Sequence, residues 1–227
     1  MKEMFINTAE LTGQTEQHIT YVNEHIGIHN LLVAPFEKMQ QAALEDGISI
    51  DIASGFRSFA RQQLIFDRKM QGSANVLDIN NEVVDLSKLA VADKINSILL
   101  YSALPGASRH HWGTDIDVYS KSLMKGKSLA LEAWEYEANG PLAPLTEWLD
   151  DNMQQFGFYR PYDKYRGGVA AEPWHLSYQP LASMFSEQYS QEVLAQCIQN
   201  SDMVGKEQVL TMLDTIYCQY VTNVGAA

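Results

Sequence analysis

The chain has 227 residues, a hydrophobic share of 46%, a charged share of 19% and a formal net charge of −12 at pH 7. These shares are typical of a soluble globular protein, and the acidic balance argues against nucleic acid or an anionic membrane as the main partner. No apolar run approaches the roughly 18 residues that a membrane-spanning helix needs.

The N-terminal part of the chain shows no clear periodic pattern. Met1–Leu11 lacks the basic start and apolar core of a signal peptide, so we expect a cytoplasmic location. His25 and His29 have the i, i+4 spacing of a helical metal-binding pair, and His18 precedes them. Gly27 interrupts that helix and no carboxylate motif accompanies the pair, which favours surface or hydrogen-bonded histidines.

Predicted helices alternate with short predicted strands along the rest of the chain. Pro35 suits the first turn of a helix that Gly47 ends, and Ser58 can cap a second helix that runs to about Met70. Hydrophobic periodicity predicts helices over residues 86–99 and 129–156, the second mostly helical and interrupted at Gly140-Pro141, and helices near residues 189–197 and 209–220. Strands are predicted over residues 48–53, 113–119 and 174–178.

Helices around a few short strands indicate an α+β fold rather than a regular βαβ series. The length suits one domain over residues 1–227, in which residues 35–180 carry the motifs and residues 181–227 add C-terminal helices. Cys197 and Cys218 fall in those helices, where free cysteines are most often small buried residues. Their spacing suits no metal site, and nothing requires a disulfide between them.

The segment from Ser108 to Asp117 gathers potential metal ligands. Two adjacent histidines, His110 and His111, precede Asp115 and Asp117, which point to the same face of a predicted strand. Imidazole and carboxylate are normal zinc ligands. Residue spacing alone does not choose between the two histidines or between the two aspartates.

A second segment, Glu172-Pro-Trp-His175, adds the groups that a hydrolytic zinc site still lacks. Such a site needs three protein ligands, an open position and a base. His175 supplies the third ligand, and Glu172 can take a proton from water and deliver it to the departing amine. The competing interpretation is a buried cluster of histidine and aspartate without metal, and the second segment argues against it.

Three separate blocks resemble motifs of the VanY-type D-alanyl-D-alanine carboxypeptidases, in the same order and with similar spacing. They are Ser54-Gly-Phe-Arg57-Ser58 followed by Gln62 for S-G-[YF]-R-S, then Ser108, His110, Gly113 and Asp117 for S-x-H-x-x-G-x-A-x-D, and Glu172 with His175 for E-P-W-H. The resemblance covers about residues 35–180. One departure is Asp115, where the family usually has alanine.

The resemblance implies a fold shared with lysostaphin-type enzymes and hedgehog domains, in which a small antiparallel sheet carries the zinc site and helices surround it. It implies that His110, Asp117 and His175 bind one zinc ion and that Glu172 is the catalytic base. One member of each ambiguous pair is thus selected by analogy. Asp115 adds negative charge near the metal and can hydrogen-bond a metal ligand.

Four residues are candidate substrate contacts, and for Arg57 the resemblance also implies contact near the scissile bond. The Arg57 guanidinium can stabilise the oxyanion on the scissile carbonyl or pair with a substrate carboxylate, with a structural salt bridge as the alternative. Ser108 and Gln62 can hydrogen-bond the terminal groups of the substrate, although the Ser108 hydroxyl also suits a turn. Trp174 can line the cleft or pack in the core.

The predicted function is zinc-dependent hydrolysis of peptidoglycan stem peptides by a D-alanyl-D-alanine or L,D-carboxypeptidase that binds a muropeptide. An endopeptidase of the endolysin type is the nearest alternative, although the sequence shows no wall-binding repeat. A non-catalytic zinc module that binds peptides is the other alternative, and the presence of Glu172 argues against it.

Overall fold

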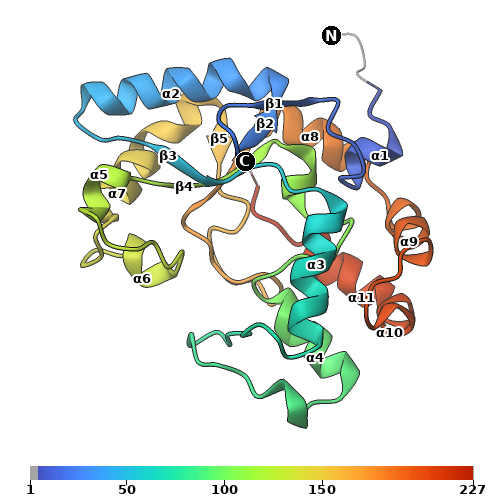
Figure 1. The fold of residues 1–227 in the computed structure, drawn as a ribbon. Helices are drawn as coiled ribbons and strands as arrows, with labels where there is room; N and C mark the ends of the chain where they lie inside the picture. The colour runs from blue at the N-terminus through green and yellow to red at the C-terminus, as the bar shows by residue number, and fades with distance from the viewer. Residues whose placement is uncertain (1–4, 227) are drawn as a thin grey trace.

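Four short strands form an antiparallel sheet in the middle of the molecule (Figure 1). In spatial order they are β3 (Asp51–Ser54), β4 (Asp115–Tyr119), β6 (His175–Tyr178) and β5 (Phe158–Tyr159). The computed structural model describes residues 5–226, so the start of the stretch considered for a signal peptide lies outside the described residues. Helices surround the sheet, which confirms the predicted α+β class.

Pairing between the two central strands places two polar residues side by side. Asp117 on β4 lies directly opposite His175 on β6, and Ile116 lies opposite Leu176. Because side chains alternate between the faces of a strand, Asp117 and His175 share one face while the two apolar residues share the other. The sheet therefore has one polar face and one apolar face at this point.

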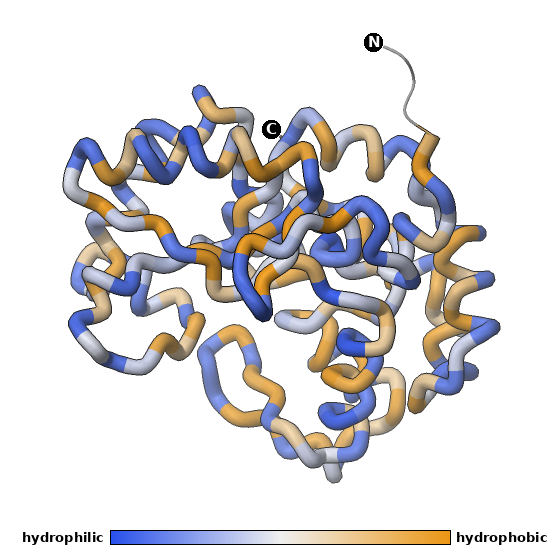
Figure 2. Tube along the Cα trace, turned by 45° about the horizontal axis from the view of Figure 1, so that its top comes forward, coloured by the Kyte–Doolittle hydropathy of each residue, from blue (hydrophilic) through white to orange (hydrophobic). Residues whose placement is uncertain are grey.

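Two helices, α2 (Val33–Glu45) and α7 (Ala143–Asn152), cover the apolar face of the sheet. Met39 and Leu149 are fully buried in the cluster that contains Ile116. Burial of each such side chain stabilises the fold by about 1.5–3 kcal/mol relative to exposure. Figure 2 shows hydrophobic and hydrophilic residues alternating along the chain, as expected of helices that bury one face.

A second apolar cluster joins the C-terminal helices to the motif-bearing region. α3 (Phe59–Met70) and α4 (Val91–Leu99) contribute Phe66 and Ile95, both fully buried. The C-terminal helices in the same cluster are α8 (Gln179–Gln188), α9 (Gln191–Gln199), α10 (Lys206–Thr211) and α11 (Leu213–Ile216). These helices therefore pack directly on the region that bears the motifs (Figure 1).

The remaining elements are short. β1 (Ile19–Tyr21) and β2 (Gly27–His29) form a separate antiparallel pair. The others are α1 (Thr8–Leu11), η1 (Asn30–Leu32), η2 (Leu86–Lys88), η3 (Arg109–Trp112), α5 (Lys121–Met124), α6 (Ala133–Tyr136), η4 (Met153–Phe156) and η5 (Tyr217–Val221). Within residues 5–226, no helix has the length and apolar character needed to cross a bilayer.

Several predicted helix boundaries are wrong for local reasons. The helix predicted over residues 86–99 is split, because the Asp85 carboxylate accepts a hydrogen bond from the Ser87 amide and closes the separate turn η2. The segment predicted as mostly helical over residues 129–156 becomes helical only at Ala133. Its predicted interruption at Gly140-Pro141 is confirmed, because α6 ends at Tyr136 and α7 begins at Ala143, with η4 after it. Periodicity also does not reveal α8.

The predicted strand over residues 48–53 begins late, at Asp51, because the Ile48 amide donates to the Ala43 carbonyl and belongs to the turn that ends α2. The two cysteines differ from each other. Cys197 is buried, as predicted, whereas Cys218 is exposed, and both thiols are free. The expectation of a buried residue is therefore wrong for Cys218, which lies on η5 at the surface.

The C-terminal segment forms hydrogen bonds with the loop that follows β5. The Gly225 amide donates to the Pro161 carbonyl at 2.7 Å, and the Asn223 side chain donates to the Arg166 carbonyl at 3.0 Å. The Gln219 side chain donates to the Gly167 carbonyl. The C-terminal segment therefore fixes the backbone of a loop that leads directly to Glu172.

His18 and His29 lie in an aromatic cluster rather than at the surface. Their ring centroids are 5.5 Å apart, and both are buried with Phe185 against them. In the described residues, neither ring nitrogen of His18 has a hydrogen-bond partner. His25 is exposed, so the i, i+4 pair considered from the sequence does not form a site.

We expect the free energy of unfolding to fall as the pH drops below about 6.5. Burial, with a smaller contribution from His18, lowers the pKa of His29 from 6.5 to about 4. The folded state therefore binds fewer protons than the unfolded state between these values, and acid favours unfolding by up to about 3 kcal/mol. Urea titrations at pH 7.5 and pH 5 measure the loss, and His29→Gln should reduce it. An unchanged pH dependence in that variant would contradict the assignment.

Candidate metal centre

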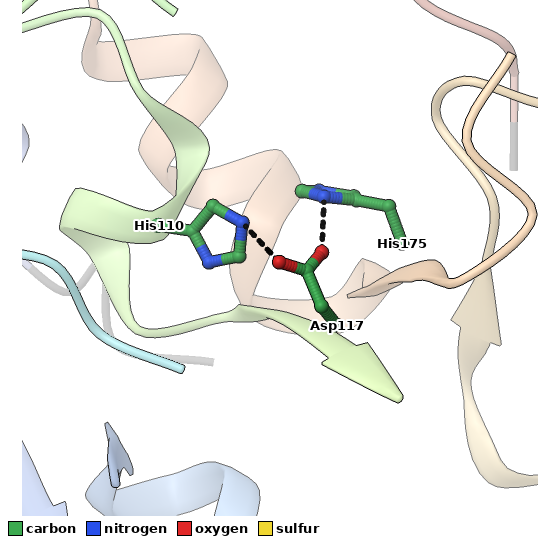
Figure 3. Close-up of side chains that lie close together, drawn as sticks. All are labelled: His110, Asp117 and His175. Atoms are coloured by element: carbon green, nitrogen blue, oxygen red, sulfur yellow. Dashed lines mark hydrogen bonds and ion pairs between the residues drawn. The ribbon is translucent and has the colours of Figure 1, made fainter. Parts of the chain in front are cut away.

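Three buried side chains meet on the polar face of the sheet: His110, Asp117 and His175 (Figure 3). One ligand atom from each lies within 4.8 Å of the others. Asp117 and His175 are brought together by the direct pairing of β4 with β6, and His110 comes from η3, just before β4. His110 therefore reaches the centre from a turn of 3-10 helix.

The backbone after β3 orients His110. Its Nδ1 lies 2.9 Å from the Gly55 carbonyl oxygen, which can only accept, so this nitrogen carries the proton. The other ring nitrogen, Nε2, then has a free lone pair and faces Asp117 Oδ2 at 3.4 Å. A carbonyl that fixes the tautomer in this way is a regular partner of a metal-binding histidine.

Two glycines permit the close packing around His110. A Cβ on Gly55 would lie 2.3 Å from the Gly27 carbonyl oxygen, and Gly113 has φ +67° and would meet the His29 amide at 2.8 Å. Any larger side chain would therefore push the S-G-F-R segment or the turn after η3 out of place. These are structural reasons for two glycines that the sequence motifs contain.

His111 does not face the centre. Its Nδ1 lies 2.6 Å from the Arg57 carbonyl oxygen, and its Nε2 accepts a hydrogen bond from the Gly106 amide at 3.0 Å. Both nitrogens are therefore occupied in holding two backbone segments. Geometry thus separates the two adjacent histidines, which spacing alone does not.

Asp115 holds His175 from the other side. Its Oδ1 lies 3.0 Å from His175 Nε2 and 2.7 Å from Arg109 Nε. Its Oδ2 accepts a hydrogen bond from Thr114. The second nitrogen of His175, Nδ1, faces Asp117 at 3.1 Å. Asp115 therefore fixes the ring so that Nδ1 points into the centre, and is a neighbour of the ligand set rather than a member of it.

The charges favour a cation at this place. Burial opposes the charge of Asp117, but His110 and His175 hold its pKa well below the usual range. Burial also opposes charge on His175, yet hydrogen bonds to Asp115 and Asp117 outweigh it and raise its pKa to about 10. Two buried carboxylates around one imidazole therefore favour a positive charge at this place, which a divalent metal would supply.

Glu172 lies beside the three ligands without joining them. Its Oε2 is 3.5 Å from His175 Nδ1, and the backbone amide of Glu172 donates to the Tyr162 carbonyl at 2.9 Å. Burial raises the pKa of Glu172 to about 7, although the charge of His175 opposes the shift. A carboxyl group with this pKa can both accept and release a proton near neutral pH.

All four groups open onto one cavity of about 480 Å³, between the sheet, α3 and the loop after β5. Arg57, Ser108 and Trp174 also line it, so three of the four candidate substrate contacts face the cavity. Gln62 does not. It is fully buried, its Nε2 donates to the Ala103 carbonyl, and its Oε1 accepts from Arg57 at 2.9 Å. In this structure Gln62 therefore binds Arg57 and the Ala103 carbonyl rather than facing the cavity.

A family model describing the VanY D-alanyl-D-alanine carboxypeptidases matches residues 25–181. The chain belongs to the VanY family. It is therefore an enzyme of the D-alanyl-D-alanine carboxypeptidase type, which confirms the resemblance seen in the three sequence blocks.

Relatives and solved structures agree with this assignment. An uncharacterized protein of Haemophilus influenzae is 39% identical over 121 residues, which are 52% of this chain and 92% of that protein. VanYB in complex with D-Ala-D-Ala has a TM-score of 0.55 at 20% identity, covering 83% of this chain and 92% of that one. A VanY D,D-pentapeptidase variant in complex with Zn(II) has a TM-score of 0.52 at 24% identity, covering 79% and 92%. At these identities the two structures show that the fold is shared.

In this VanY-family protein, Asp115 stands where alanine is usual, and its pairing with Arg109 explains the exchange. The two charges are 2.7 Å apart and almost completely buried. Arg109 also donates to Ser177 at 2.7 Å and to Tyr159 at 3.1 Å. The sequence gives no direct sign of this network, because it depends on burial and on the register of β4 with β6.

We expect Asp115→Ala to weaken metal binding about 10–100-fold, because His175 loses the group that orients it. The same change leaves Arg109 buried without a partner and should lower stability by roughly 3–5 kcal/mol. Arg109→Met combined with Asp115→Ala removes both charges and should recover most of the stability but not the affinity. Zinc competition with a chelator and thermal unfolding measure the two effects. Wild-type affinity in the double variant would contradict the orienting role.

Proposed function

We propose that the protein is a zinc-dependent carboxypeptidase that removes the terminal D-alanine from peptidoglycan stem peptides. The observation that carries the proposal is the convergence of His110, Asp117 and His175 on one cavity. A fourth group, the carboxyl of Glu172 with a pKa of about 7, lines the same cavity. Two imidazoles and one carboxylate beside an open cavity fit the ligand set of a catalytic zinc ion. The VanY relative that was solved with Zn(II) supports this choice of metal.

The chain's own side chains supply the proton transfers. Zinc held by the three ligands would polarise the scissile carbonyl and lower the pKa of a water molecule toward about 7. Glu172 takes the proton of the attacking water and passes it to the nitrogen of the departing D-alanine as the carbon–nitrogen bond breaks. Arg57 lines the same cavity and stabilises the negative charge that develops on the carbonyl oxygen.

Digestion of defined muropeptides followed by mass spectrometry tests the proposal. The enzyme should release one alanine from a pentapeptide stem, and a chelator should abolish the release until zinc is restored. Comparison of pentapeptide with tetrapeptide stems separates D,D- from L,D-specificity. Cleavage inside the stem would indicate an endopeptidase instead. Stoichiometric zinc without turnover on any muropeptide would indicate a peptide-binding module.

A further inference from the structure

Two cations line the cavity without a carboxylate partner. Arg57 donates only to the neutral oxygens of Gln62 and Ser54, and Lys69 donates only to the Ser102 hydroxyl, at 2.6 Å. Neither forms an ion pair within the part of the chain that the structure describes. Burial lowers the pKa of Lys69, and the charge of Arg57 lowers it further.

Positive charge that is partly removed from water and has no counter-charge lowers stability, so proteins retain it mainly where a ligand supplies the anion. Lys69 is half-buried, and among the described residues it forms no ion pair with a neighbour. Its ammonium group has three donors, and Ser102 uses one. Two N–H groups are therefore free to bind an anionic group that enters the cavity.

Helix α3 positions the two cations, Arg57 and Lys69, at the cavity. Gln62 and Lys69 are seven residues apart and therefore lie on the same face of α3, two turns from each other. Both reach the segment that follows α4, because Gln62 donates to the Ala103 carbonyl and Lys69 donates to Ser102. Gln62 fixes Arg57, so one helix face sets the position of both cations.

Arg57 and Lys69 have different neighbours. Arg57 is influenced by the charges of Asp117 and Glu172, at the place where the scissile bond would lie. Lys69 is influenced by Arg57 and Glu172, and Asn75 and Tyr101 lie with it along the cavity wall. The terminal carboxylate lies one residue beyond the scissile carbonyl, about 3.8 Å further along in Cα spacing, so its position would be next to the scissile bond in the same cavity that Lys69 lines.

We propose that Lys69 binds the terminal carboxylate of the peptide substrate and so restricts cleavage to the last peptide bond. The inference rests on the proposed peptidase function and assigns the recognition of the free chain end to one side chain. A charged hydrogen-bond pair of this kind is worth a factor of about 10–100 in binding.

The test compares N-acetyl-L-Lys-D-Ala-D-Ala with its C-terminal amide. The wild-type zinc enzyme should prefer the free acid by at least about tenfold in kcat/KM. Lys69→Met should lose about 10–100-fold on the acid, mainly through KM, and should change little on the amide. Lys69→Arg should recover part of the loss. Lys88→Met is the matched control, because Lys88 lies at the surface, paired only with Asp85.

A binding measurement tests the role of Lys69 independently of the proposed peptidase activity. In the Glu172→Gln background, isothermal titration with the acid should show about 10–100-fold weaker binding after the additional change Lys69→Met. Equal binding of the acid by the two proteins would overturn the role of Lys69, whatever the turnover. An equal loss on acid and amide would overturn it too. Absence of hydrolysis by the wild type, with the binding difference present, would overturn the peptidase function alone.

Discussion

Glu172→Gln is expected to reduce peptide hydrolysis by a factor of about 10²–10⁴ and to leave zinc bound. The amide cannot take up a proton from water, and positioned acid–base groups contribute factors of about 10²–10⁴. Glu172 is not within the ligand set, since the groups that converge are His110, Asp117 and His175. The change from carboxyl to amide preserves shape, so the cavity should stay intact.

The experiment pairs steady-state kinetics with metal analysis on the same preparation. Glu137→Gln is the matched control, because Glu137 is exposed and does not line the cavity. It should keep wild-type rates. Two results would contradict the assignment of Glu172. One is normal turnover by Glu172→Gln, and the other is loss of zinc from it, which would make Glu172 a ligand.

The raised pKa of Glu172 gives this prediction its physical basis. A surface carboxylate with an ordinary pKa would be a poor proton donor at neutral pH. Burial raises the pKa of Glu172 to about 7, while Arg57 and Lys69 act in the opposite direction. The group can therefore exist in both protonation states during one catalytic cycle.

The candidate site was accessible from sequence because its residues fall in short motifs on adjacent strands. Asp117 and His175 are far apart in the chain, but each belongs to a predicted strand, and the structure pairs them directly. The resemblance to the family selects between neighbouring residues by analogy, and the structure supplies the physical reason for that choice. His111 is turned away by the backbone groups it binds, and Asp115 is held by Arg109.

Other features could not be read from the sequence, because they depend on contacts between distant segments. Gln62 accepts a hydrogen bond from Arg57, and its own side chain is fixed by the Ala103 carbonyl. That contact requires the segment after α4 to pack against α3. The sequence places Lys69 seven residues after Gln62, on the same face of a predicted helix. Only the structure shows that this face lines the cavity, so the functional relevance of Lys69 was not predictable. Likewise, the Gly225–Pro161 hydrogen bond joins residues that no local pattern connects.

His110→Ala is expected to remove zinc binding and, with it, all chelator-sensitive hydrolysis. The His110 side chain offers Nε2 to the centre because its Nδ1 is fixed by the Gly55 carbonyl. Loss of one of three ligands should weaken zinc binding far more than the 10–100-fold expected of a residue that only orients a ligand. Metal content after dialysis and zinc-dependent stabilisation against heat measure the effect.

His111→Ala provides the decisive comparison, because His111 is the adjacent histidine and is also buried. This change should lower the melting temperature, since the Gly106 amide loses its acceptor, but the purified protein should still bind one zinc ion per chain. His25→Ala, at an exposed position, should alter neither property. Full zinc occupancy in His110→Ala together with zinc loss in His111→Ala would reverse the assignment. The orientation of His110 by Gly55 would then have to change when metal binds.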